Sequence, residues 1–119
     1  MIDRPVPQMV VVDHGTEAGI DWATCEAPLY GAINGYVRIP EGHPWHGLNY
    51  EEIYVEAPGG LTYSENGWIG FDTLHLGDYW PGMRQAGYGP PSFHDMEWDA
   101  GMVAEEARLL AQRVAEAAS

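Results

Sequence analysis

The chain has 119 residues, with 18 acidic side chains against five basic ones, and its formal net charge is −13 at neutral pH. This length allows one domain, and the negative charge excludes a basic surface of the kind that binds a nucleic-acid backbone. Hydrophobic residues make up 45% of the chain and five residues are Trp, which is too apolar for a disordered acidic tail. We therefore expect a single domain, residues 1–119, with a hydrophobic core and no direct nucleic-acid binding.

The cysteine content and the apolar runs bear on the compartment. Cys25, the one cysteine, cannot form an internal disulfide or a multi-cysteine zinc site, which favours a reducing environment. No run approaches the ~18 apolar residues of a membrane span. The first twelve residues lack the basic start of a secretion signal. These features predict a soluble cytoplasmic protein with no membrane contact.

The first part of the chain shows little regular patterning. Residues 1–33 contain early prolines and scattered glycines, with one short β-prone run over 9–12, so we predict an irregular N-terminal segment. Residues 36–39 are typical of a short strand, which ends at a proline. Gly, Pro, His and Trp residues then predict a loop over 41–49.

Three further β-prone runs follow, over residues 51–56, 60–64 and 67–72. The turns between them are short and rich in Gly, Pro and Asn, which tolerate tight backbone geometry. Apolar and polar residues alternate in the first and third runs, as in a strand with one buried face. These patterns predict an antiparallel meander, with residues 34–78 as the sheet core.

The last forty residues divide into a loop and a helix. Residues 79–94 contain six Gly and Pro residues and are predicted to be a loop. The segment 95–119 has apolar residues at alternating steps of four and three, which predicts an amphipathic helix over 98–118 with Ser92 or Asp95 as N-cap. The predicted fold class is α+β, a small antiparallel meander packed against one C-terminal α-helix.

Two loops concentrate side chains that can carry chemistry. If the sheet brought these loops together, three imidazoles and two carboxylates would meet, and the set could hold a transition metal or supply a general acid–base pair. No HExxH or His-Cys-Cys pattern supports a metal, so we expect no metal and no other cofactor. The side chains are Glu41, His43 and His46 in the first loop and Asp72, His75 and Asp78 in the second.

The same residues also fit structural roles, which we favour for each. A carboxylate directly after a strand, such as Asp72, commonly accepts a hydrogen bond from the turn that follows. His75 lies between two leucines, which is typical of a partly buried histidine bonded to a backbone carbonyl. His43 and His46 fit solvated loop positions, and Trp45 fits the edge of the core.

Nucleophilic catalysis has little support in this sequence. Glu26 beside Cys25 would raise the pKa of the thiol, and the chain has no nucleophile elbow and no phosphate-binding loop. Trp45 and Trp80, with aromatic neighbours, could instead form a stacking surface for a planar ligand, although large rings also fill small cores. Mimicry of a nucleic acid by the acidic surface is a minor alternative, because the acidic residues are spread along the chain.

Four strings of the sequence together resemble a family of small accessory proteins of tailed bacteriophages, especially those of actinobacteria. The strings are NGYV at 34–37, IPEGHP at 39–44, GGLTYS at 59–64 and GFDTLHLGD at 70–78, and the final helix continues the resemblance. Related chains tend to have a His in place of Pro58 and often a Cys in place of Thr73. The resemblance implies a phage or prophage accessory protein in the bacterial cytoplasm, and it brings no established activity.

We therefore predict a binding protein rather than an enzyme. It would bind a host protein or a small nucleotide-like ligand in the host cytoplasm and antagonise a host defence system, an argument by analogy. The alternative is a small hydrolase that uses His43, His75 and Asp72, with or without a metal, and homo-oligomer formation is left open. The predicted binding residues are Glu41, His43, Trp45, His46, Thr62, Asp72, His75, Asp78 and Trp80.

Overall fold

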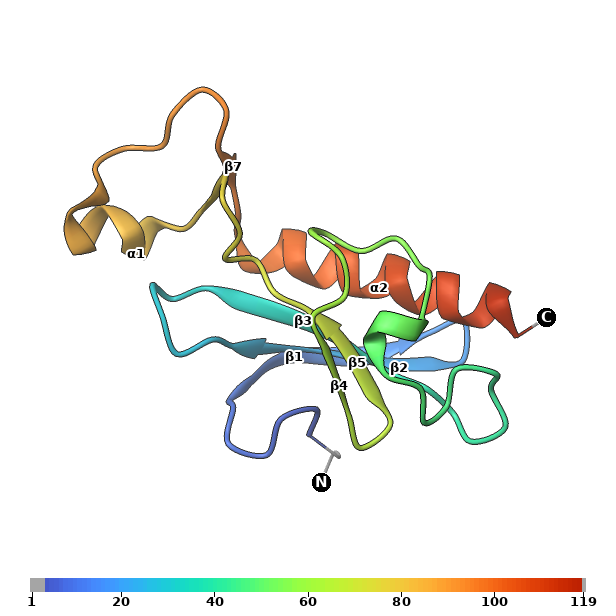
Figure 1. The fold of residues 1–119 in the computed structure, drawn as a ribbon. Coiled ribbons are helices and arrows are strands. Elements are labelled where there is room, and N and C mark those ends of the chain that lie inside the picture. Colours follow the sequence, from blue (N-terminus) through green and yellow to red (C-terminus); the bar gives the residue numbers. More distant parts are fainter. Residues whose placement is uncertain (1–3, 119) are drawn as a thin grey trace.

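Five antiparallel strands form one sheet in the spatial order β1-β2-β3-β5-β4, and helix α2 lies across one face of it (Figure 1). The computed structural model describes residues 4–118. The predicted α+β class, an antiparallel sheet against a C-terminal helix, is confirmed. The main elements are β1 (Val11–Glu17), β2 (Ile20–Glu26), β3 (Ile33–Arg38), β4 (Tyr63–Glu65), β5 (Trp68–Phe71) and α2 (Ala100–Ala117).

The prediction of an irregular segment over residues 1–33 is wrong, because β1 and β2 lie within it. They form a hairpin whose turn residues, Ala18 and Gly19, both have positive φ. β1 is an edge strand with mostly exposed side chains and an irregular register between Val11 and Asp13, so it lacks a clear apolar face. β2 is buried on both faces, so it lacks the period-two contrast that marks a strand in the sequence.

The predicted strand over residues 51–56 is also absent. Asn49 instead caps a short 3-10 turn, η1 (Tyr50–Glu52): its side chain accepts a hydrogen bond from the Glu51 backbone, and Glu52 accepts one from the Asn49 backbone. Residues 53–57 then have no strand pairing, and the buried Ile53 packs into the core. As a result β3 pairs directly with β5, and β4 is a short edge strand beyond it.

The region predicted as a loop over residues 79–94 contains short helical turns. They are α1 (Pro81–Met83) and the π-helical turn η2 (Arg84–Tyr88). On either side of them, β6 (Asp78–Tyr79) pairs in parallel with β7 (Met96–Glu97). We call residues 78–97 the arm, because Figure 1 shows α1 and the loop after it standing out from the body.

Helix α2 begins later than predicted. Its N-cap is Asp99, whose side chain accepts a hydrogen bond from the Met102 backbone at 2.8 Å, and neither Ser92 nor Asp95 has that role. Asp95 instead accepts a hydrogen bond from the Ser92 backbone within the arm. Several apolar side chains of α2 are fully buried on the sheet, as the four-three spacing predicts. Within residues 4–118, no helix has the length and apolar character to cross a membrane.

Both faces of the central strands are buried. The larger apolar cluster lies between the sheet and α2, where Phe71 and Ile69 of β5 belong to the same cluster as Leu110. A smaller cluster on the opposite face contains Tyr36 and Trp68, with residues of the N-terminal segment packed against it. The one-sided burial predicted for the run over residues 67–72 is wrong: all four residues of β5 are buried, because Ile69 and Phe71 face the larger cluster and Trp68 faces the smaller one.

Two glycines permit the close pairing of β3 with β5. Gly35 lies opposite Phe71 and Gly70 lies opposite Tyr36 in adjacent pairs of the ladder. A Cβ atom at Gly35 would overlap the Phe71 ring, and one at Gly70 would overlap the Tyr36 ring. Because Phe71 and Tyr36 belong to the clusters on opposite faces, each aromatic ring covers a glycine of the partner strand. The two rings therefore fill the space over the two glycines, one on each face of the sheet.

We expect Gly35→Ala to lower the free energy of unfolding by about 1–3 kcal/mol, because the buried Phe71 ring must move to accept the methyl group. Gly101→Ala in α2 is the matched control, since its methyl group would approach only the Asp99 side chain, at 3.3 Å, and alanine favours a helix. Urea unfolding of the two variants and the parent protein measures the difference. Equal stabilities of the two variants would contradict this account of Gly35.

Candidate binding site

His43 has a structural role at the end of α2. Its Nε2–H donates to the backbone carbonyl of Val114 at 2.8 Å, and its Nδ1 accepts from the Trp45 backbone N–H at 2.9 Å. Because a backbone N–H can only donate, the ring must carry its proton on Nε2. The prediction of a solvated His43 is therefore wrong: the side chain is buried and both of its nitrogens are bonded within the protein.

His75 lies between two carboxylates of the second loop. Its Nδ1 is 3.2 Å from Asp78 Oδ2 and its Nε2 is 3.3 Å from Asp72 Oδ1. The histidine is partly buried, as predicted, but its partners are carboxylates and not a backbone carbonyl. Asp72 also accepts from the Leu74 backbone at 3.2 Å, which confirms its expected turn role. The ring lies so close to Gly59 that a Cβ atom there would overlap it.

The structure does not bring the three histidines together. His43 bonds to Val114 near the end of α2, whereas Asp78 of the His75 cluster bonds to Trp98, just before that helix. The helix between these contacts is about 21 Å long at 1.5 Å per residue. Within residues 4–118, no group of three or more His, Cys, Asp or Glu side chains is placed to hold a metal ion.

The other predicted site residues also lie apart. Glu41, His46 and Thr62 are exposed, and none of them lines the groove that contains Trp80. Trp45 is half-buried and packs against the main cluster, as expected for a ring at the edge of the core. Trp80 is nearly buried, so it forms the floor of a groove and not an open stacking surface.

Two indole rings are held in place by the loop that follows β5. Trp80 Nε1 donates to Thr73, to its hydroxyl at 3.0 Å and to its carbonyl at 3.2 Å. Trp98 Nε1 donates to Asp78 Oδ1 at 2.8 Å. The polar residues around His75 therefore position the two rings, which are only 4% and 6% exposed.

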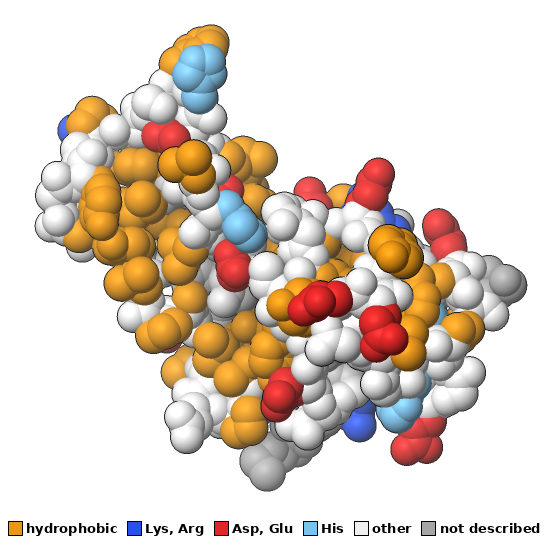
Figure 2. Space-filling model, in the orientation of Figure 1, with side chains coloured by type: hydrophobic (Ala, Val, Ile, Leu, Met, Phe, Trp, Pro, Cys, Tyr) orange, Lys and Arg blue, Asp and Glu red, His pale blue; other side chains and the backbone are white. Residues whose placement is uncertain are grey.

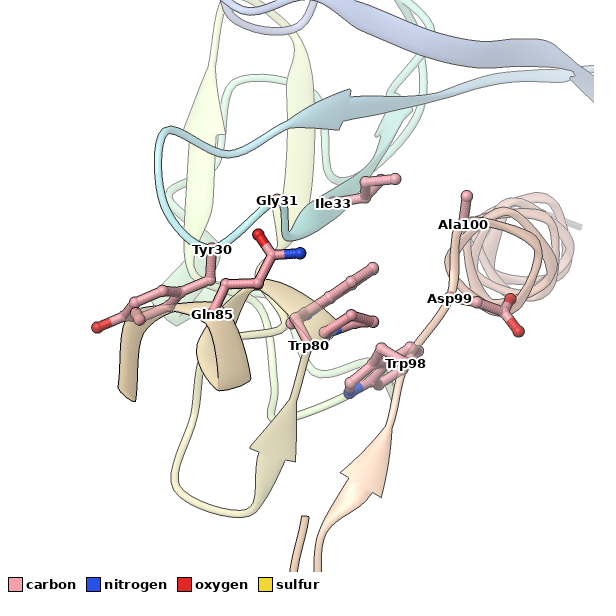
Figure 3. Close-up of a pocket in the computed structure, with 11 residues that line it drawn as sticks. Tyr30, Gly31, Ile33, Trp80, Gln85, Trp98, Asp99 and Ala100 are labelled. Carbon is pink, nitrogen blue, oxygen red and sulfur yellow. The ribbon is translucent and has the colours of Figure 1, made fainter. Parts of the chain in front are cut away.

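These rings belong to a groove of about 780 Å³ between the arm, the β2–β3 turn and the start of α2 (Figure 3). In Figure 3 the Gln85 amide points into the groove, whereas the Tyr30 ring points outward. No Lys, Arg or His of the described chain lines the groove. Its walls are formed by Tyr30, Gly31, Ile33, Trp80, Pro81, Gly82, Gln85, Ala86, Trp98, Asp99 and Ala100.

Two contacts fix the arm against the β2–β3 turn. Gly82 lies on the backbone of Tyr30, so close that a Cβ atom at Gly82 would overlap the Tyr30 carbonyl. The hydroxyl groups of Tyr30 and Tyr88 share a hydrogen bond of 2.7 Å, and their rings meet edge to face at 5.4 Å. The groove therefore has a defined wall on the arm side.

Large apolar side chains are exposed on and beside the arm. Figure 2 shows orange side chains gathered on the side of the molecule that carries the arm, with acidic side chains concentrated on the opposite side of that view. The exposed residues are Leu29, Leu76, Tyr88, Phe93 and Met96, of which Leu76 and Phe93 are almost fully exposed. Of the apolar and aromatic residues in this region, the sequence predicted only Trp80 as a binding residue, although aromatic side chains in a Gly- and Pro-rich segment are a signal for an exposed apolar surface.

Comparison of the sequence with protein-family models found no match, and comparisons with curated proteins and with solved structures found no match either.

Cys25 is a buried thiol in β2. Burial raises the pKa of Cys25 from its ordinary 9.0 to about 11, and the Arg4 charge offsets part of that rise. The pKa of Cys25 is raised, as expected, but the cause is burial of the thiol and not the neighbouring Glu26. A thiol that is both buried and protonated at neutral pH is a poor nucleophile.

We expect the stability of the protein to fall as pH rises from about 9 to about 11. In this range the unfolded chain has lost the Cys25 proton while the folded protein still holds it, so deprotonation favours unfolding. Urea unfolding of the parent protein and of Cys25→Ala at a series of pH values tests this. The variant should lose less stability across the range, and identical slopes would contradict the assignment.

We expect Gly82→Ala to release the arm from Tyr30 without unfolding the sheet, because the new methyl group would overlap the Tyr30 backbone. Amide hydrogen exchange should accelerate at residues 82–88 and remain slow in β2 and β3. Ala86→Ser is the control, since Ala86 is exposed on the same segment. Unchanged exchange in Gly82→Ala would show that the arm does not depend on this contact.

Proposed function

We propose that this chain is a phage- or prophage-encoded accessory protein of the host cytoplasm that binds a host protein through the arm and the groove at its base. The carrying observation is the group of large apolar side chains that are exposed on and beside the arm, namely Leu29, Leu76, Tyr88, Phe93 and Met96. Exposed apolar surface marks interaction sites, and aromatic and Met side chains are enriched in them. By covering a host defence protein, such binding would antagonise that defence.

Binding has more support than hydrolysis in the arrangement of the candidate catalytic groups. Both nitrogens of His43 are bonded inside the protein, and both nitrogens of His75 face carboxylates. Each ring nitrogen of these two histidines therefore already has a partner within the protein. Cys25, the one thiol, is buried in the sheet.

A small nucleotide-like ligand in the groove is the second candidate. The volume of about 780 Å³ lies within the range of about 300–1,000 Å³ that is typical of small-molecule sites. The Gln85 amide could donate to and accept from a heterocyclic edge. However, no basic side chain of the described residues lines the groove to bind a phosphate, so this candidate ranks below a host protein.

The test compares Phe93→Ser with Tyr54→Ser, because these aromatic side chains are 96% and 92% exposed but only Phe93 belongs to the arm. Each variant is used to capture proteins from host lysate, and native mass spectrometry then identifies what stays bound. We expect Tyr54→Ser to retain the host protein bound by the parent chain, and Phe93→Ser to bind it at least about tenfold more weakly.

Equal capture by both variants, together with an unchanged phage phenotype, would show that the arm is not the binding surface. A retained metabolite in place of a host protein would favour the second candidate.

A further inference from the structure

The floor of the groove is apolar and rigid. The indole N–H groups of Trp80 and Trp98 are bonded to Thr73 and Asp78 behind the floor, so the rings offer carbon atoms to an occupant. The buried Ile33 lies beside them. Because these side chains are already ordered, an apolar side chain that enters the groove costs little rearrangement of the protein.

One polar group points into this apolar space. The Gln85 side chain is exposed, and Figure 3 shows its amide reaching towards the centre of the groove. Within residues 4–118 it makes no hydrogen bond to another residue, and its amide carries both donors and an acceptor. This combination matches the backbone amide of a visiting peptide segment.

The edge of the groove on the α2 side is acidic. Asp99 lines this edge, and its carboxylate is turned towards the helix terminus, where it accepts from the Met102 backbone; in Figure 3 it points away from Trp98. Glu97 precedes it on β7, and Glu106 lines the adjacent depression next to Trp98, where Arg113 is paired with Glu56. In the segment from residue 72 to residue 99, Arg84 is the one Lys or Arg, and the whole chain carries a charge of −13. This arrangement attracts cations and repels phosphates.

We propose that the occupant is a basic segment of the partner protein, with an aromatic or aliphatic side chain in the groove and an adjacent Arg or Lys next to Asp99. This inference rests on the proposed function and specifies the chemistry of the partner. Charge complementarity selects this occupant over a second copy of the chain, whose own −13 charge would oppose association.

Two variants separate the apolar and the electrostatic parts of the proposal. Ala86→Trp adds an indole to the groove wall at an exposed position, so it should block entry without removing a core contact. Asp99→Asn removes the charge at the edge, while asparagine caps a helix about as well as aspartate does. The fold of α2 should therefore survive in both variants.

The experiment is an NMR titration of the full chain, labelled with ¹⁵N, with two matched synthetic pentapeptides. One is acetyl-Gly-Lys-Trp-Lys-Gly-amide and the other replaces both lysines by glutamates. We expect the basic peptide to shift the Gln85 side-chain amide and the Trp98 indole N–H signals, with a Kd at least about tenfold lower than that of the acidic peptide. Asp99→Asn should reduce the ratio of the two Kd values by about threefold or more. Ala86→Trp should abolish the signal shifts with both peptides.

Equal or tighter binding of the acidic peptide would overturn the inference, as would binding that survives in Ala86→Trp. AMP is the third probe, and tighter binding of AMP than of the basic peptide at the same signals would identify a nucleotide as the occupant. Should these results go against a basic segment while Phe93→Ser still loses the host protein, the inference fails and the proposed function stands. Unchanged host capture by Phe93→Ser contradicts the proposed function by itself.

Discussion

The pairing of β3 with β5 is the contact on which the rest of this structure depends. These strands are far apart in the sequence, and they approach closely because Gly35 makes room for Phe71 on one face and Gly70 makes room for Tyr36 on the other. The hairpin of β1 and β2 joins the sheet through β3, and β4 joins it through β5. Phe71 also belongs to the main apolar cluster beneath α2. A side chain at Gly35 would therefore disturb the apolar layer beneath α2, and one at Gly70 would disturb the layer on the opposite face.

The same strand pair sets the position of the groove. Thr73, just beyond β5, is buried, and its hydroxyl donates to the Ile33 carbonyl at the start of β3 at 2.8 Å and accepts from Trp80 at 3.0 Å. Asp78 then holds Trp98, and His75 lies between Asp78 and Asp72. Residues that are typical of catalytic sites thus form a polar network that orients two indole rings. Such a network fixes one geometry because an unbonded member would be costly to bury.

Acidic and apolar features are separated on the surface, and this separation supports binding as the function. Most of the large apolar side chains that are exposed lie on or beside the arm, while carboxylates lie at the α2 edge of the groove and across much of the remaining face in Figure 2. In protein complexes, apolar anchors contribute most of the affinity and charges mainly select the partner and speed association. An apolar groove with an acidic edge is suited to a partner that combines an apolar anchor with positive charge.

Local sequence patterns determined the elements whose burial is one-sided or whose turns are marked by glycine. The spacing of Val103, Ala107, Leu110 and Val114 specified α2, and the runs around β4 and β5 were placed to within a few residues. β1 and β2 were not predicted, because neither an exposed edge strand nor a strand buried on both faces shows a strong alternation of apolar and polar residues. The candidate site depended on contacts between distant segments: burial of His43 under α2, docking of Gly82 on Tyr30, and the bond from Asp78 to Trp98. Only the tertiary structure decided these, because non-sequential strand pairing sets which loops meet, and no local period encodes that pairing.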